Sequence, residues 1–265
     1  MFLPIGDSPN PAGTPWVTYL LLGTNVLVFI MLWPLTGQAP DRGDPALRAY
    51  IDTMVHEHGL FATEVRPFLS HISAHDLFVF EHGFKPAAPA VLDLITSMFL
   101  HGGLLHLLGN MLFLWIYGDN VEHRLGKLGF LLAYLATGVA ACVGDGVLRM
   151  GSAIPSVGAS GAISGVLGFY FVWFPRNRVR VWVFLFPVVA RVIEMRARLV
   201  LGFYIVFQNI LPVLLTGGAS GVSHGAHLGG FLAGVVGAFL LNRLSFARPE
   251  RDVSRRPTTP DDLPN

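Results

Sequence analysis

A serine in a glycine-rich setting is the first residue whose surroundings suggest chemistry. Gly158-Ala159-Ser160-Gly161 follows a polar stretch that contains Pro155, and no charge then appears before Arg176. The polar stretch is not expected to be helical, so a helix should run over residues 160–174. A serine at a helix N-terminus has backbone N–H groups and the positive end of the helix dipole nearby, and both favour a developing oxyanion. The motif therefore predicts a nucleophile, although a serine that caps a closely packed helix gives the same pattern.

Two histidines near the C-terminal end are candidate bases. They lie in Ser223-His224-Gly225-Ala226-His227-Leu228-Gly229-Gly230, and histidine is rare in apolar segments unless it has a function. Small residues recur in this segment every four positions, at Ala226, Gly230 and Gly234. The segment after Ser160 has a similar set, at Gly161, Gly165 and Gly168. Such stripes let two helices approach closely. We expect His227 to reach Ser160 as the base. His224, one turn earlier, is the second choice, and a histidine bonded to a loop carbonyl is the alternative reading.

A third polar set consists of His101, His106 and Asn110. At 100° per residue His106 and Asn110 share one helix face, whereas His101 is expected to point elsewhere and to fix the preceding loop. Two donors on one face could bind an oxyanion, and hydrogen bonding between helices is the alternative. Asp93 and Asp145 lie at the ends of apolar segments, so no carboxylate is expected to orient the base. The three sets together predict one acyl-transfer site with a Ser–His dyad.

The composition indicates which kind of protein must position these residues. Of the 265 residues, 52% are hydrophobic and only 13% are charged, whereas soluble domains carry about 25% charged residues. This excludes an ordinary soluble enzyme and a disordered chain, and a net charge of +1 argues against a nucleic-acid binder. The single cysteine, Cys142, excludes a disulfide framework and a cysteine-rich zinc site. An all-α membrane protein remains.

Apolar blocks of bilayer length predict the individual elements. We expect six transmembrane helices, at about residues 16–35, 94–117, 128–144, 160–174, 199–216 and 222–242. The outer loop 36–93 has apolar residues at helical spacing and is expected to hold short helices at the membrane surface. Val179–Ala190 is apolar but short and is interrupted by Pro187, which predicts an interfacial segment. Residues 1–15 are expected to be a cytoplasmic segment, and residues 243–265 a disordered cytoplasmic tail.

The distribution of positive residues predicts the orientation. Thirteen Lys and Arg residues flank the spans on the side of both termini, and five lie on the other side. Cytoplasmic loops carry the excess of positive charge, so both termini should be cytoplasmic and the site should open outward. Sixteen arginines against two lysines are typical of a GC-rich genome, which favours a bacterial inner (plasma) membrane.

The motifs resemble, in this order and on these spans, the rhomboid family of intramembrane serine proteases. The matching pieces are His101-x4-His106-x3-Asn110, Glu122-His123-Arg124, Gly158-Ala159-Ser160-Gly161 and Ala226-His227-Leu228-Gly229-Gly230. The resemblance implies a six-helix bundle around a water-filled cavity. It implies Ser160 as the nucleophile and His227 as general base and then general acid. His106, the Asn110 side chain and the Ser160 backbone N–H would stabilise the oxyanion.

The resemblance also implies supporting residues and substrates. Glu122 and Arg124 match a Glu-x-Arg pair of the family and would be structural, as would the remaining motif positions: His101, Gly158, Gly161 and Gly230. Substrates would be single-pass membrane proteins, cut near the outer surface of the membrane. The protein's other contacts would be with membrane lipids, and no metal, nucleotide or nucleic acid would be needed.

Two positions depart from the family pattern. Leu92 and Asp93 occupy the place where many members have Trp-Arg, which affects the anchoring of the outer loop. Ser164 occupies the position four residues after the nucleophile, where many members have an aromatic residue packed against the catalytic histidine. Ser164 lies on the same helix face as Ser160, which makes it the main rival for the role of nucleophile.

Two other functions stay open at this point. The chain could be a catalytically inactive rhomboid-like scaffold that binds client membrane proteins, although such proteins usually lack the serine or the histidine. The outer loop holds five histidines and could bind a structural metal, with surface solvation as the more ordinary reading: His56, His58, His71, His75 and His82. The spacing in His56-Glu57-His58 is too tight for the zinc motif of a metalloprotease.

Overall fold

A bundle of long helices dominates the computed structural model, which describes residues 2–58, 71–185, 189–216 and 222–244. Its helices are α1 (Trp16–Leu32, followed by a 3₁₀ turn to Gly37), α6 (Leu104–Leu125), α7 (Lys127–Leu148), α8 (Ser160–Trp173), α9 (Ala197–Ile205), α10 (Leu211–Thr216) and α11 (His224–Arg243). Four helical stretches are long and apolar enough to cross a membrane: Trp16–Gly37, Lys127–Leu148, Ala197–Leu215 and His224–Arg243. The predicted all-α membrane architecture is confirmed at this level.

The second predicted span begins later than the sequence indicates. Residues Asp93–Thr96 form a short helix, α5, and Ser97–Phe99 form a 3₁₀ turn. This pair meets α6 at an angle of 94°. The prediction of one helix from residue 94 is wrong because Gly102 and Gly103, which favour bends over helix interiors, interrupt an uncharged run. His101 therefore lies in the bend and not on the helix that carries His106 and Asn110.

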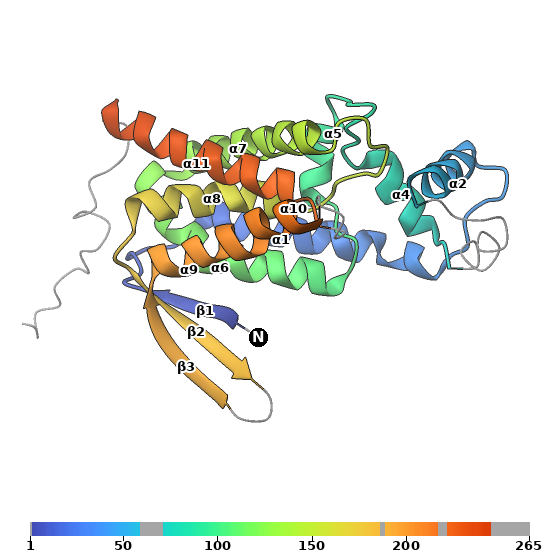
Figure 1. The fold of residues 1–265 in the computed structure, drawn as a ribbon. Helices are drawn as coiled ribbons and strands as arrows, with labels where there is room; N and C mark the ends of the chain where they lie inside the picture. Colours follow the sequence, from blue (N-terminus) through green and yellow to red (C-terminus); the bar gives the residue numbers. More distant parts are fainter. Residues whose placement is uncertain (1, 59–70, 186–188, 217–221, 245–265) are drawn as a thin grey trace, which may run out of the picture.

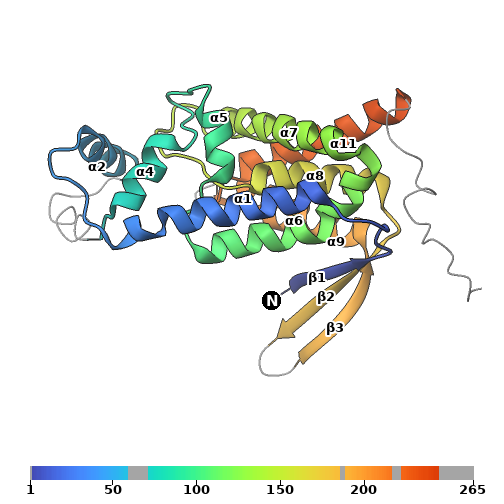
Figure 2. The same ribbon diagram turned by 180° about the vertical axis from the view of Figure 1, so that it is seen from behind.

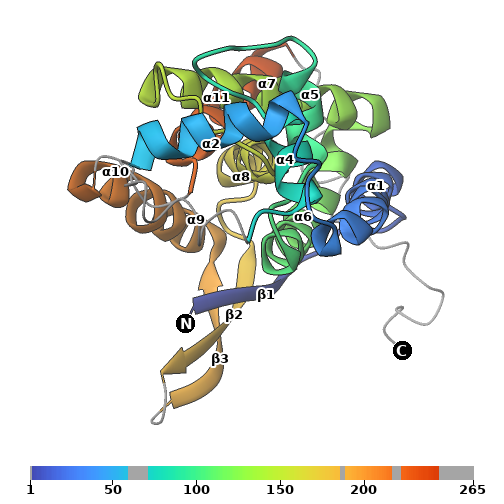
Figure 3. The same ribbon diagram turned by 90° about the vertical axis from the view of Figure 1, so that its right-hand side faces the viewer.

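Helix α8 lies at the centre of the bundle, between α6, α7 and α11 (Figure 3). Its 14 residues span about 21 Å at 1.5 Å per residue, less than the hydrocarbon core, and eleven of them are buried. A Cβ atom on Gly230 would lie 2.0 Å from the backbone oxygen of Gly161, and one on Gly234 would lie 2.0 Å from that of Gly165. The predicted close packing of these two helices through small residues is thus confirmed.

The C-terminal end of α6, which carries Glu122 and Arg124, lies at the side of the bundle where α1 begins and α11 ends (Figure 2). Glu122 is buried near the end of α6, and its carboxylate accepts hydrogen bonds from the backbone N–H groups of Val17 (3.0 Å) and Thr18 (2.7 Å) and from the Thr18 hydroxyl (2.8 Å). Helix α1 has no cap of its own, so this carboxylate satisfies its first N–H groups. The Arg124 guanidinium lies over the ring of Trp173, 4.7 Å from its centroid.

Replacement of Glu122 by alanine should destabilise the protein without touching the candidate site. Two backbone donors and a hydroxyl would lose a buried, charged acceptor, which costs about 2 kcal/mol. The thermal unfolding midpoint in detergent should fall for Glu122→Ala and stay unchanged for Glu81→Ala, whose carboxylate is exposed. Equal midpoints for the two variants would contradict the capping role.

A three-stranded antiparallel sheet departs from the all-α expectation. The strands are β1 (Phe2–Ser8), β2 (Arg178–Leu185) and β3 (Val189–Arg196), in the order β1-β2-β3. Arginine and valine alternate at the start of β2, which is the period of a strand with one buried face: Val179 and Val181 are fully buried, while Arg178 and Arg180 are exposed.

The first strand is tied to the bundle through Asp7, which is buried. Asp7 accepts hydrogen bonds from the Tyr170 hydroxyl of α8 and from Asn120 Nδ2 of α6 (3.0 Å). Burial raises the pKa of Asp7 to about 7, and the bond from Tyr170 opposes part of this rise. The strand is therefore fixed against α6 and α8 by a buried polar contact and not by backbone pairing alone.

The outer loop contains helices, as its apolar spacing predicts. Among its described residues these include α2 (Pro45–His58) and α4 (Ala74–His82), which meet through an edge-on contact between the rings of Tyr50 and Phe80. Across the parts of the chain that the structure describes, no three His, Cys, Asp or Glu side chains are grouped to hold a metal ion. The predicted disordered tail falls almost wholly at residues 245–265, outside the described residues.

Candidate active site

One cavity brings the predicted site residues together. It has a volume of about 480 Å³ and lies between α6, α8, the loop before α8, the segment from α9 to α10, and the start of α11. Ser160, His227, His106 and Asn110 all line it. The sequence predicted these four side chains from three separate segments, and the tertiary structure places them on the wall of a single hollow.

Ser160 and His227 are in direct hydrogen-bonding contact. The distance between Ser160 Oγ and His227 Nε2 is 2.9 Å, and both side chains are partly exposed to the cavity. Ser160 is the first residue of α8, where N–H groups lack partners within the helix. The pair therefore has the distance at which an imidazole can take the proton of a nucleophilic hydroxyl.

A third residue, Asn209, completes the hydrogen bonds of this imidazole, and the sequence analysis missed it. Asn209 is fully buried, and its Oδ1 lies 2.7 Å from His227 Nδ1. Its Nδ2 donates to the backbone oxygen of Tyr204 (3.1 Å), which fixes the orientation of the amide. Because Oδ1 can only accept, Nδ1 must carry the proton, and Nε2 is left to accept from Ser160.

Local helix geometry places Asn209 against the histidine. Residues Val206–Ile210 form a π-helical turn between α9 and α10, and such turns are frequent at functional sites because the extra residue redirects the side chains that follow. A signal was present in the sequence. Gln208 and Asn209 are adjacent amides in an apolar, uncharged span, and polar residues at that depth are functional candidates.

The two rival residues occupy different places. Ser164 is fully buried, and its hydroxyl pairs with that of Tyr204 at 3.1 Å, not with an imidazole. His224 reaches the same oxygen of Asn209 as His227 does, at a longer distance of 3.5 Å. The geometry therefore favours Ser160 as the nucleophile and His227 as its base.

His106, Asn110 and His101 form a polar group on the opposite side of the cavity. Asn110 Nδ2 donates to His101 Nε2 at 2.9 Å, and the rings of His101 and His106 are 5.2 Å apart. The expectation that His101 points elsewhere is wrong, because the bend at Gly102 and Gly103 brings it back over Asn110. An amide nitrogen carries two N–H groups, so the bond to His101 leaves one N–H of Asn110 for another acceptor.

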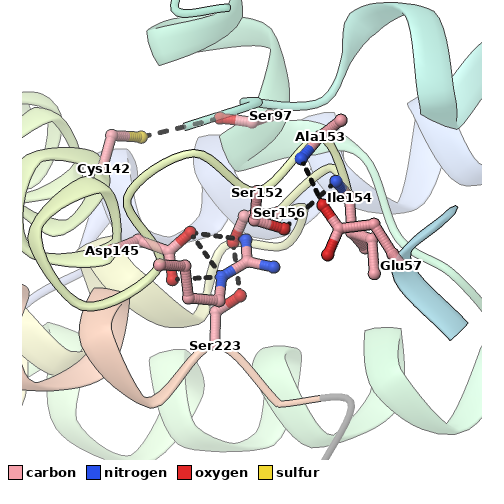
Figure 4. Close-up of polar contacts among 10 residues, drawn as sticks. Glu57, Ser97, Cys142, Asp145, Ser152, Ala153, Ile154, Ser156 and Ser223 are labelled. Carbon is pink, nitrogen blue, oxygen red and sulfur yellow. Dashed lines mark hydrogen bonds and ion pairs between the residues drawn. The ribbon is translucent and has the colours of Figure 1, made fainter. Parts of the chain in front are cut away.

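Gly158 lets the loop before α8 pass close to these side chains. Its φ angle of +121° is rarely adopted by other residues, and a Cβ atom would lie 2.7 Å from the His106 ring. The same loop is tied to distant segments, as Figure 4 shows: Glu57 of α2 accepts from Ala153 N at 2.9 Å, and the hydroxyls of Ser156 and Ser223 are 2.6 Å apart. These contacts hold the entrance of α8 in place.

Comparison with known proteins identifies the family. The model of the rhomboid domain matches residues 88–244, more than half of the chain and all of the segments that line the cavity. The chain belongs to the rhomboid family. Together with its apolar helices, this makes it an integral membrane protein.

Similar rhomboids come from several kinds of organism. The chain is 32% identical to Rhomboid-like protein 11, chloroplastic, of Arabidopsis thaliana, over 63% of this chain and 58% of that protein. It is 47% identical to the rhomboid protease GluP of Bacillus subtilis, over 28% of this chain and 14% of that protein. It is 30% identical to Rhomboid protein 1, mitochondrial, of Saccharomyces cerevisiae, over 60% of this chain and 44% of that protein. The chain thus covers less than two thirds of each of these relatives.

The two departures from the rhomboid pattern have structural counterparts. Tyr204 of α9 bonds to Ser164, and its ring centroid lies 6.2 Å from that of His227, so an aromatic ring from another helix lies beside the histidine. Asp93, in the place of the expected arginine, is buried and lies 3.9 Å from the ammonium group of Lys85. The loop is thus anchored by an ion pair that the sequence did not indicate.

Proposed function

We propose that this protein is an intramembrane serine endopeptidase that hydrolyses a peptide bond in or near the transmembrane segment of single-pass membrane proteins. The observation that carries the proposal is the 2.9 Å contact between Ser160 and His227 in a cavity that also holds His106 and Asn110. A client-binding scaffold would not need a hydroxyl paired with an oriented imidazole.

In the first step Ser160 Oγ attacks the scissile carbonyl carbon while His227 Nε2 takes the hydroxyl proton. Asn209 Oδ1 accepts from Nδ1–H throughout, which holds the imidazole in the tautomer that can act as a base and stabilises it when it is protonated. His227 then donates the proton to the leaving amine. Asn209 acts through His227 and is a positioning residue.

The negative charge that develops on the attacked carbonyl oxygen needs hydrogen-bond donors. The Asn110 amide and His106 on α6, together with the backbone N–H of Ser160, are the groups suited to this role. Water then attacks the acyl-enzyme, with His227 again as the base, and regenerates Ser160. The proposed steps need groups of this chain and one water molecule.

Asn110→Ala is expected to lower kcat by about 10² to 10³, the effect of removing one oxyanion donor. The variant should remain folded, because the hydrogen bond that it removes joins Asn110 to His101 of the adjoining bend. Leu108→Ala on the outward face of the same helix is a matched control with unchanged kcat. A folded Asn110→Ala variant that cleaves like the wild type would refute the oxyanion role.

The orientation in the membrane is proposed from the distribution of positive residues. The excess of positive residues lies at the end of the bundle where α1 begins and α11 ends, so this end faces the cytoplasm and the cavity opens on the other side. We propose a bacterial inner (plasma) membrane as its location, on the arginine content of the sequence.

The proposed activity is tested by co-expression with a set of model single-pass substrates. Mass spectrometry of the products should show one cut at the outer end of the transmembrane segment. Intact substrates throughout, with folded enzyme that a fluorophosphonate probe does not label, would favour the scaffold function instead.

A further inference from the structure

The hairpin of β2 and β3 leaves the bundle as a separate feature. Its base is fixed: Val179 and Val181 are fully buried, and Phe2 of the neighbouring β1 packs on Phe203 of α9 with ring centroids 5.3 Å apart. Figures 1 and 2 show that the hairpin starts at the end of the bundle where α8 finishes, and that it slants back obliquely while diverging from the helices. It does not extend away from them along the bundle axis.

The polarity of the hairpin changes along its length. On the face turned away from the bundle, the cross-strand pairs run from charged to apolar: Arg178 with Arg196, Arg180 with Glu194, then Trp182 with Val192. Trp182 and Val192 are 36% and 51% exposed. On the other face, Val181 is buried whereas Arg191, two residues farther out, is exposed. At this level the cover by the bundle is only partial, since Val183, the cross-strand partner of Arg191, is partly buried against the core.

The charge of this region is strongly positive. Residues 178–198 contain five arginines and one glutamate. The glutamate, Glu194, pairs with Arg178 at 3.5 Å, and both side chains are exposed. Arg191, Arg196 and Arg198 are exposed as well, so the hairpin and the start of α9 present more cations than anions to their surroundings.

We propose that the β2–β3 hairpin is a membrane-interface anchor that binds anionic phospholipid headgroups through its arginines and sets Trp182 and Val192 at the boundary between headgroups and acyl chains. Tryptophan is enriched at that depth, and basic residues are attracted to anionic leaflets. The direction of the hairpin places its apolar part at the level of the lipid that surrounds α1 and α9, where Trp16 at the start of α1 is also exposed.

Two features limit how deeply the β2–β3 hairpin can enter the membrane. The sheet has outer edges on β1 and β3 whose backbone groups are not paired within the described residues, and such edges are excluded from hydrocarbon. Arg191 lies close to the tip and must keep its guanidinium among phosphates or water. The hairpin therefore rests in the interfacial layer and does not cross the membrane.

Single-cysteine variants of the whole protein in phospholipid vesicles test this anchor. In a Cys142→Ala background, an environment-sensitive fluorophore is attached at Val192→Cys and, as the matched control two residues nearer the base, at Glu194→Cys. At position 192 we expect a blue-shifted emission, loss of quenching by aqueous iodide, and stronger quenching by nitroxide lipids labelled near the headgroup than by those labelled deep in the chain. Position 194 should remain open to iodide.

Two further experiments vary the charge of the lipids and the protein-to-lipid ratio. Replacing part of the phosphatidylcholine by phosphatidylglycerol should strengthen the lipid quenching at position 192, and the double variant Arg191→Gln, Arg196→Gln should lose this gain. Iodide quenching at position 192 as strong as at 194 would overturn the proposal. Protection that grows with the protein-to-lipid ratio would also overturn it, because it would indicate contact between copies of the chain. No arm reads cleavage, so the result is independent of the proposed peptidase activity.

Discussion

Ser160→Ala is expected to abolish substrate cleavage and fluorophosphonate labelling while the protein stays folded. The probe needs a hydroxyl that an adjacent base has activated, and Ser160 Oγ is 2.9 Å from His227 Nε2. Ser160 begins α8 and is partly exposed to the cavity, so loss of its hydroxyl leaves no buried void and the thermal unfolding midpoint should change little. Gel fluorescence of the labelled protein and the product yield measure the two losses.

Ser164→Ala is the matched control for this prediction. Ser164 is one turn further along the same helix, and its hydroxyl is bonded to Tyr204. This variant should keep its labelling and most of its cleavage. Labelling that survives in Ser160→Ala and disappears in Ser164→Ala would transfer the role of nucleophile to Ser164 and overturn the proposed mechanism.

Asn209→Leu should lower kcat by about 10², within the range that a positioned acid–base group contributes, with little effect on KM. Leucine has a similar size but no acceptor, so His227 would lose the bond that holds Nδ1–H. Steady-state kinetics with a cleavable single-pass substrate would measure the effect. Asn25→Leu makes the same substitution at another fully buried helical asparagine, on α1, and should leave kcat unchanged.

A second variant separates positioning from a merely structural role of Asn209. Asn209→Asp keeps an acceptor next to Nδ1 and should recover part of the activity. The acidic limb of its profile of kcat/KM against pH should move to higher pH, because a carboxylate stabilises the protonated imidazole. If both variants only lowered the unfolding midpoint and neither altered the rate of the folded enzyme, Asn209 would have no part in positioning the base.

Much of the site could be predicted because its signals are local. Uncharged blocks of bilayer length predict helices, and a serine, histidines and an asparagine within them are costly enough to indicate function. The stripes at Gly161 and Gly230 even predicted which helices pack together, since only small residues allow backbones to approach that closely. Ser160, His227, His106 and Asn110 were identified in this way, and all four line one cavity.

Other features depend on contacts between distant segments and leave no periodic trace in the sequence. The π-helical turn shifts the face on which Asn209 lies, since one extra residue turns a helix by about 100°, and the turn itself packs against α11, which is distant in the sequence. The bend that returns His101 to Asn110 and the pairing of Lys85 with Asp93 are of the same kind. Residue types and their spacing therefore predicted the membrane fold and the four cavity residues. The orientation of the base depends on packing between segments that are distant in the sequence. The packing energy arises only when both segments are in contact, so the sequence of either one alone does not indicate it.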